Sequence, residues 1–257
     1  MNIKKIKEKS KLLIRPYYKK LSSSVLFNFY FHMAFYLPCQ IFKVAAKSNP
    51  AVYQSLYKTI SIVYLAVSLL IIPIFSLSYL ILIAKIANKK DSEVEPDISF
   101  KAFLSNFKYA FLAIGNNFWT ILWLVIWCIP AFTFTYAFVH FFFSLASVLG
   151  IIVYLLAIFG FILYKYCSYF MNSYAIADDT ETEVFEAMDI SKRITKGHRW
   201  EIIKLSFSFI GYPLLVTLTL GIASIWVTPY ISMTYFNVYK ELSVKASRHE
   251  EKPEVLI

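Results

Sequence analysis

Four acidic side chains lie close together in the second half of the chain: Asp178, Asp179, Glu181 and Glu183. Carboxylate oxygens of this kind bind Mg²⁺ or Ca²⁺. They also suit the start of a helix, where the helix dipole stabilises negative charge, and Thr180 stands three residues before Glu183, the spacing of a capping box. We therefore predict helix capping and no metal site, with Asp178 and Asp179 as the candidates if a metal binds.

Polar side chains interrupt two of the apolar stretches. Asn28 and His32 lie one helical turn apart, and Asn116 with Asn117 lies at comparable depth in a later stretch. Such residues can mark a substrate or proton path through a membrane. They can also form hydrogen bonds between helices, at roughly 0.6 kcal/mol per bond. We favour the structural role and predict a polar layer that joins the first and third spans, with a polar cavity as the alternative.

Three tryptophans repeat every four residues and share one side of a helix: Trp119, Trp123 and Trp127. Trp127 fits an interfacial aromatic belt, whereas Trp123 and Trp119 lie deeper than such a belt. The stripe could line a groove for a lipid or another apolar ligand. Aromatic stripes usually pack against neighbouring helices, so packing is our first interpretation.

Motifs of soluble-type catalysis are missing from the sequence. We find no HExxH, no GxSxG, no phosphate-binding loop and no dinucleotide fingerprint. The three cysteines, Cys39, Cys128 and Cys167, are too isolated to indicate disulfides or a zinc site, so we interpret them as packing residues. No catalytic residue and no cofactor is predicted. An intramembrane hydrolase or transferase, with its residues spread over several spans, stays open as a third class.

The segments that carry these residues have the composition of membrane-spanning helices. The chain has 257 residues, 58% hydrophobic and only 16% charged, whereas soluble domains have about 25% charged residues. Residues 109–164 hold no Lys, Arg, Asp or Glu, and a run of this length is far longer than a barrel strand. The sequence therefore predicts an all-α fold, a polytopic transmembrane helical bundle with short interfacial helices.

The apolar runs predict about six spans within a transmembrane domain of residues 21–242. Pro130 is expected to stop the third span. Residues 205–239 are uncharged and would extend about 52 Å as one helix, beyond the roughly 30 Å hydrocarbon core, so we divide them at Gly221. The two resulting spans are expected to form a bent, centrally packed antiparallel hairpin. The predicted spans are 25–44, 60–84, 109–129, 144–164, 202–220 and 222–239.

The polar segments between spans predict two short interfacial helices. Apolar residues recur at helical spacing over residues 100–107. Over residues 184–194 they share one side of a helix that Gly197 would close, and charged residues take the other side. We expect the second of these helices to lie on the membrane surface.

Positive charge is concentrated at the N-terminus. The net charge is +10, and residues 1–20 hold eight basic groups against Glu8. We predict a basic cytoplasmic tail that binds anionic lipid headgroups, worth roughly 1 kcal/mol per basic residue, and no nucleic-acid binding. The tail can form an amphipathic helix, which Ser10 interrupts. Its apolar residues near one helical face are Ile3, Ile6, Leu13 and Tyr17.

The distribution of Lys and Arg predicts the topology. With six spans, 23 of the 26 basic residues lie on one side, and the other side holds Lys43, Lys47 and Lys58. The positive-inside rule then places both termini in the cytoplasm. Residues 243–257 are the predicted polar, cytoplasmic C-terminal tail.

Part of the sequence is similar to a known family. The residues that carry the similarity are YAIADD at 174–179, Ser191 and Lys192, GHRW at 197–200, SFIGY at 208–212 and TLGIASIWVTPY at 219–230. This stretch resembles an uncharacterised family of bacterial integral membrane proteins, domain of unknown function 975. Tyr212 departs from the family's usual Trp, and Ala131 from its usual Gly. The resemblance implies a multi-pass protein of the bacterial cytoplasmic membrane and no catalytic residue.

Two functional hypotheses follow. The first is a non-enzymatic accessory or protective membrane component that acts through membrane lipids or a membrane protein partner. The alternative is a small transporter or lipid-handling protein with a polar cavity that faces the cytoplasm. A conduit needs a continuous polar path, whereas an accessory protein needs only a sealed bundle.

Overall fold

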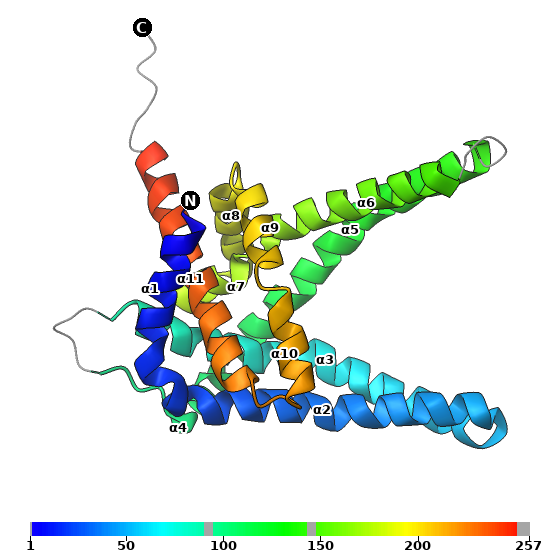
Figure 1. The fold of residues 1–257 in the computed structure, drawn as a ribbon, viewed down its shortest axis with the longest axis horizontal. Coiled ribbons are helices and arrows are strands. Elements are labelled where there is room, and N and C mark those ends of the chain that lie inside the picture. Colours follow the sequence, from blue (N-terminus) through cyan, green and yellow to red (C-terminus); the bar gives the residue numbers. More distant parts are fainter. Residues whose placement is uncertain (1, 90–94, 143–147, 251–257) are drawn as a thin grey trace, which may run out of the picture.

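The computed structural model describes residues 2–89, 95–142 and 148–250, and these ranges contain helices and no strand. The predicted all-α class is therefore confirmed, as Figure 1 shows. In chain order the helices are α1 (Ile3–Ile14), η1 (Arg15–Tyr17), α2 (Tyr18–Ser48), α3 (Pro50–Ala87), α4 (Phe100–Ser105), η2 (Asn106–Tyr109), α5 (Ala110–Phe142), α6 (Val148–Tyr169), α7 (Asn172–Asp178), α8 (Val184–Thr195), α9 (Arg199–Phe207), α10 (Gly211–Leu218) and α11 (Ser224–Glu250).

In the described part of the chain, five helical segments are long and apolar enough to cross a membrane, whereas the sequence predicts about six spans. The predicted sixth span, 222–239, lies in α11, which is less apolar because its second half is polar and charged. The five segments are Ile3–Ser48, Pro50–Ala87, Phe100–Phe134, Tyr154–Asp178 and Arg199–Leu218.

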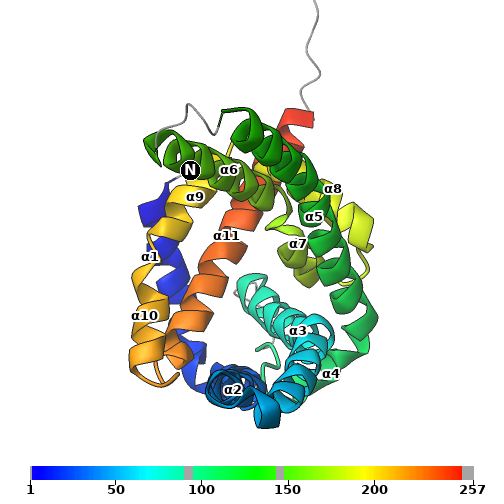
Figure 2. The same ribbon diagram turned by 90° about the vertical axis from the view of Figure 1, so that its right-hand side faces the viewer.

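Two long hairpins project from one side of the molecule and diverge from each other (Figures 1 and 2). The first is α2 with α3, which turns at Asn49, and Pro50 is the first residue of α3. The second is α5 with α6. The expected stop at Pro130 is wrong, because Pro130 lies inside α5. Membrane helices accommodate a proline when neighbouring groups form hydrogen bonds with the backbone carbonyl that the proline leaves without a partner.

The buried core lies where the bases of the two hairpins meet the short helices. The second half of α3 supplies a continuous buried run over residues 77–84, α7 and α11 pack against α3, and α8 packs in turn on α7 and α11. Phe103 of α4 and Phe236 of α11 are fully buried in this core. Where their side chains are described, the hairpins are largely exposed or half-buried, as expected for surfaces that meet lipid.

The basic N-terminal segment is part of this core. Helix α1 packs against α11, with Ile6 and Ile14 buried. Ser10, which interrupts the apolar stripe in the sequence, is also fully buried and accepts a hydrogen bond from Asn237 Nδ2 at 2.8 Å. The apolar face of α1 is thus covered by protein and is not free to lie on a membrane. Its exposed face still presents lysines, including Lys4 and Lys11.

The C-terminal hairpin turns at Gly221, where the sequence places it. Leu220 and Gly221 both have positive φ, at 49° and 90°, and these values suit a tight reversal. A second break at residues 208–210 separates α9 from α10. The hairpin is packed unevenly: residues 233–239 in the middle of α11 are all buried, whereas α10 has no buried residue. The expected central packing therefore holds only for α11, and this helix extends into the predicted tail as far as Glu250.

Candidate binding sites

A pocket with mostly apolar walls lies where the C-terminal hairpin meets the first long hairpin, and we call it the polar pocket because Asn28 and His32 of α2 both line it. Its volume is about 350 Å³. Four helices, α2, α3, α10 and α11, contribute to its wall, and none of its lining residues is Lys, Arg, Asp or Glu. The lining residues are Val25, Asn28, Phe29, His32, Met33, Tyr79, Val216, Ser224 and Thr228.

The turn at Gly221 docks on α2 beside this pocket, against its lining residue Phe29. A Cβ atom at Gly221 would lie 2.6 Å from Cζ of Phe29 and closer still to two other atoms of that ring. Tyr30 donates a hydrogen bond from its hydroxyl to the carbonyl oxygen of Leu220 at 3.4 Å. The turn therefore needs a glycine, because the ring of Phe29 occupies the place that a Cβ would take.

The polar groups around the pocket are only partly satisfied by the protein. His32 Nε2 lies 3.3 Å from the hydroxyl of Tyr64 on α3. The hydroxyl of Tyr79 is buried and has no hydrogen-bond partner, and the same holds for Ser24 one turn before Asn28. A buried hydroxyl without a partner costs about 1–3 kcal/mol.

The other two predicted polar residues lie elsewhere. Asn116 donates to Ser173 Oγ at 2.9 Å, and Asn117 donates to the carbonyl oxygen of Leu69 at 3.4 Å. The prediction of one polar layer that joins the first and third spans is therefore wrong. The reason is that α5 packs against α3 and α7, whereas α2 packs against α3 and α11.

A second polar group surrounds Asn116 instead. Asn172 of α7 donates to Thr120 Oγ1 at 2.7 Å. Ser173 accepts the hydrogen bond from Asn116 and donates one to Asn172 Oδ1. The sequence offers a weak signal for this group, because Thr120 lies one helical turn after Asn116 and on the same face of α5.

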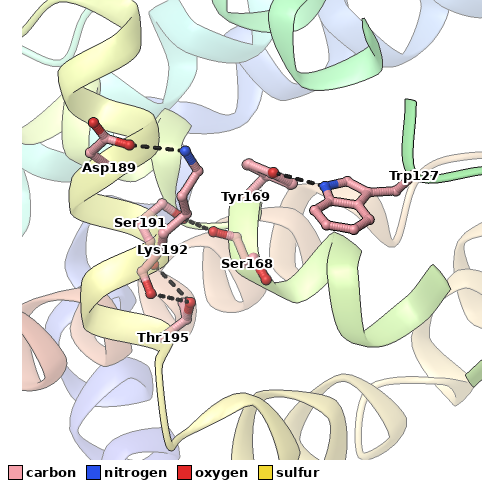
Figure 3. Close-up of polar contacts among 7 residues, drawn as sticks. All are labelled: Trp127, Ser168, Tyr169, Asp189, Ser191, Lys192 and Thr195. Atoms are coloured by element: carbon pink, nitrogen blue, oxygen red, sulfur yellow. Dashed lines mark hydrogen bonds and ion pairs between the residues drawn. The ribbon is translucent and has the colours of Figure 1, made fainter. Parts of the chain in front are cut away.

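The tryptophan stripe of α5 faces α8 and α6. Trp119 lies 4.7 Å from the ring of Phe185, centroid to centroid, and Trp123 lies beneath Lys192 Nζ, at 5.6 Å. Trp127 Nε1 donates to the hydroxyl of Tyr169 at 3.2 Å, as Figure 3 shows. All three rings thus contact protein, which is the arrangement that helix packing requires.

Ser191, one of the residues that carry the family resemblance, fixes α8 to the end of α6 (Figure 3). Its hydroxyl donates to the carbonyl oxygen of Ser168 at 2.9 Å and accepts from the backbone N–H of Met171 at 3.1 Å. The next residue, Lys192, forms an ion pair with Asp189 at 2.9 Å. Ser191 is fully buried, so its two bonds satisfy backbone groups that water cannot reach.

Asp178 and Asp179 each have a structural role. Asp178 forms an ion pair with Lys240 of α11 and accepts from Asn88 Nδ2 at 2.8 Å, so it ties α7 to α11 and to the end of α3. Asp179 accepts from the backbone N–H of Glu181 at 3.0 Å. Over residues 2–89, 95–142 and 148–250, no group of three or more His, Cys, Asp or Glu side chains could hold a metal ion.

The predicted capping box at the start of α8 does not form. Glu183 is the N-cap residue, and its side chain makes no capping hydrogen bond. Thr180 instead donates to the hydroxyl of Tyr109 at 3.1 Å. The apolar face of the helix is also buried by the protein, with Ala187 and Met188 almost fully covered, so α8 does not rest on a membrane through this face.

The comparisons with known proteins agree with the resemblance found in the sequence. A family model described as "Protein of unknown function (DUF975)" matches residues 1–246, so the chain belongs to this family. No curated protein and no solved structure matches the chain.

Proposed function

We propose that this chain is a non-enzymatic integral membrane protein that binds a lipid with an uncharged, hydrogen-bonding headgroup. The observation that carries this proposal is the polar pocket around Asn28 and His32. It favours the lipid-handling hypothesis over a sealed accessory bundle, because a sealed bundle would not need an open polar pocket among apolar helices.

The chemistry of the pocket points to the class of ligand. Asn28 offers an amide, His32 an imidazole, and Ser224 and Thr228 offer hydroxyls, whereas no lining group carries a fixed charge. These groups match the hydroxyl and ester oxygens of a neutral glycerolipid or glycolipid. Apolar lining residues such as Val216 provide contacts for the start of an acyl chain.

The proposed setting is the bacterial cytoplasmic membrane, with both termini in the cytoplasm. The asymmetry of basic residues supports this topology. The five long apolar segments of the described chain support insertion, and the proposal counts the first half of α11 as a sixth crossing, because an even number of crossings is needed to bring both termini to one side. The exposed lysines of α1 would then face the inner leaflet, where anionic headgroups attract them, as proposed for the N-terminal segment.

The test is to purify the full chain with its native lipids and to identify bound lipids by mass spectrometry. We expect a neutral lipid in the wild type and its loss in the pocket variants Asn28→Leu and His32→Leu. Asn117→Leu is the matched control, because it removes the same amide from an apolar helix outside the pocket. Equal lipid content in all four proteins would exclude the proposal.

An accessory role is the second candidate, and the exposure of α10 favours it. Leu214, Leu218 and Leu220 are all more than 60% exposed, and they form an apolar surface that another membrane protein could cover. A protein that co-purifies in fixed ratio and is lost in Leu218→Asn, with no bound neutral lipid, would support the accessory role in place of lipid binding.

A further inference from the structure

A second pocket, away from the polar one, lies between α6 and α9. Its volume is about 250 Å³ and its walls are almost wholly apolar. It is a groove that follows the two helices, because its residues recur at helical spacing along both. The lining residues are Phe159, Leu163, Tyr166, Cys167, Phe170, Ile202, Ile203, Ser206, Phe207 and Ile210.

An arginine stands at the end of this groove where α9 begins. Arg199 precedes Ile202 and Ile203 by three and four residues, so all three lie on one face of the helix. Its guanidinium carbon lies 4.3 Å above the ring of Tyr164 on α6. Its Nε atom is buried and has no hydrogen-bond partner. The guanidinium thus rests on the Tyr164 ring, and its Nε donor makes no hydrogen bond.

A second cation lies close to Arg199. Lys165 of α6 is within electrostatic range of it, and its Nζ atom lies 3.2 Å from the centre of the Trp127 ring. In the described part of the chain, neither cation has a carboxylate partner. The nearest acidic residue in sequence, Glu201, is engaged by His198 Nδ1 at 2.8 Å. Two cations without a carboxylate partner therefore lie beside the apolar groove, Arg199 one turn before its lining residue Ile202 and Lys165 next in sequence to its lining residue Tyr166.

We propose that this groove binds an anionic phospholipid. Arg199 and Lys165 would contact the phosphate, and one acyl chain would lie along the groove toward Phe159 and Ile210. Arginine suits a phosphate because its planar N–H groups can donate two parallel hydrogen bonds. Apolar walls of the observed size suit an acyl chain and not a soluble phosphate.

This site is independent of the polar pocket. It involves α6 and α9, whereas the polar pocket involves α2, α3, α10 and α11. Under the proposed topology, the end of α6 and the start of α9 lie at the inner membrane surface, where anionic lipids are abundant. An experiment that excludes lipid binding at one site would therefore not count against lipid binding at the other.

The test uses the full chain in detergent, with phosphatidylglycerol and phosphatidylcholine as probes. Native mass spectrometry counts bound lipid, and thermal unfolding reports stabilisation. We expect phosphatidylglycerol to bind and to raise the unfolding temperature, and phosphatidylcholine to do neither. Arg199→Gln and Lys165→Gln should each weaken phosphatidylglycerol binding by about tenfold or more, as expected for loss of a charged hydrogen bond.

The matched control is Lys196→Gln, which removes the same charge from an exposed lysine three residues before Arg199. It should leave binding within about twofold, and Arg199→Lys should recover part of it. Ile210→Trp, at the exposed far end of the groove, should weaken phosphatidylglycerol binding by obstructing the acyl chain. Equal effects of Lys196→Gln and Arg199→Gln, or equal binding of both lipids, would overturn the proposal.

Discussion

Replacing Gly221 by alanine should destabilise the protein far more than the small size of the added methyl group suggests. The backbone at Gly221 has a φ of 90°, which costs a residue with a Cβ about 1–2 kcal/mol. The new Cβ would also overlap the ring of Phe29, and displacing that ring from its packed position costs about 1–2 kcal/mol more. We therefore expect the free energy of unfolding to fall by about 2–4 kcal/mol.

A double-mutant cycle separates these two costs. In a Phe29→Leu background the overlap is smaller, so Gly221→Ala should cost about 1–2 kcal/mol, the part due to φ alone. The control is Gly160→Ala in α6, where no atom lies within 4 Å of the added Cβ, and helix propensity predicts a gain of up to about 1 kcal/mol.

The assay is reversible unfolding by sodium dodecyl sulfate in mixed micelles, read from tryptophan fluorescence. If Gly221→Ala and Gly160→Ala give the same stability, the close approach of the turn to α2 is wrong. In that case the pocket beneath the turn has no defined wall. The result would therefore bear on the proposed lipid site as well as on the fold.

Three further outcomes are expected. Asp178→Asn should lower the free energy of unfolding by about 1–2 kcal/mol, because it removes the ion pair with Lys240, and a Lys240→Met background should abolish most of this effect in the same unfolding assay. A hydrogen bond from Lys20 holds the pKa of the Glu95 carboxyl below its ordinary value of 4.5. Because the pKa is lower in the folded protein, the contact stabilises the fold above pH 4.5, and this stabilisation is lost as the pH falls through the folded pKa. In Glu95→Gln, the unfolding temperature should change less with pH over that acidic range than in the wild type. An unchanged pH profile would contradict the contact. Ser48→Cys should react with a membrane-impermeant thiol reagent added to intact cells, whereas a cysteine in the last turn of α11 should not, and the reverse pattern would invert the topology.

The sequence predicted those features that depend on local physics. Long uncharged runs require helices in a membrane, so the helical class and the positions of the long hairpins follow from hydropathy. The turn at Gly221 also follows, because glycine tolerates the positive φ that a reversal needs. The stop at Pro130 failed because a proline inside an apolar helix can be accommodated by its surroundings.

Features that depend on distant partners could not be predicted. Ser10 looks like a defect in an amphipathic stripe, yet its partner is Asn237, which lies 227 residues away in sequence. The capping box failed for the same reason, since Thr180 bonds to Tyr109 on another helix. Asn28 and Asn116 each interrupt an apolar stretch, so the sequence alone does not distinguish them. Only the packing of the helices shows that Asn28 lines the pocket and that Asn116 belongs to the polar group around Ser173.

The residues that carry the family resemblance differ in what they do, and this difference favours the groove as a site. Asp178, Ser191 and Gly221 each satisfy a structural need: an ion pair between helices, two buried backbone groups and a tight turn. Arg199 contacts the Tyr164 ring, but it faces no carboxylate in the described chain and its buried Nε makes no hydrogen bond. A cation held in this way against Tyr164 gains about 0.5–2 kcal/mol from the ring. That gain does not neutralise its charge, whereas a bound phosphate would.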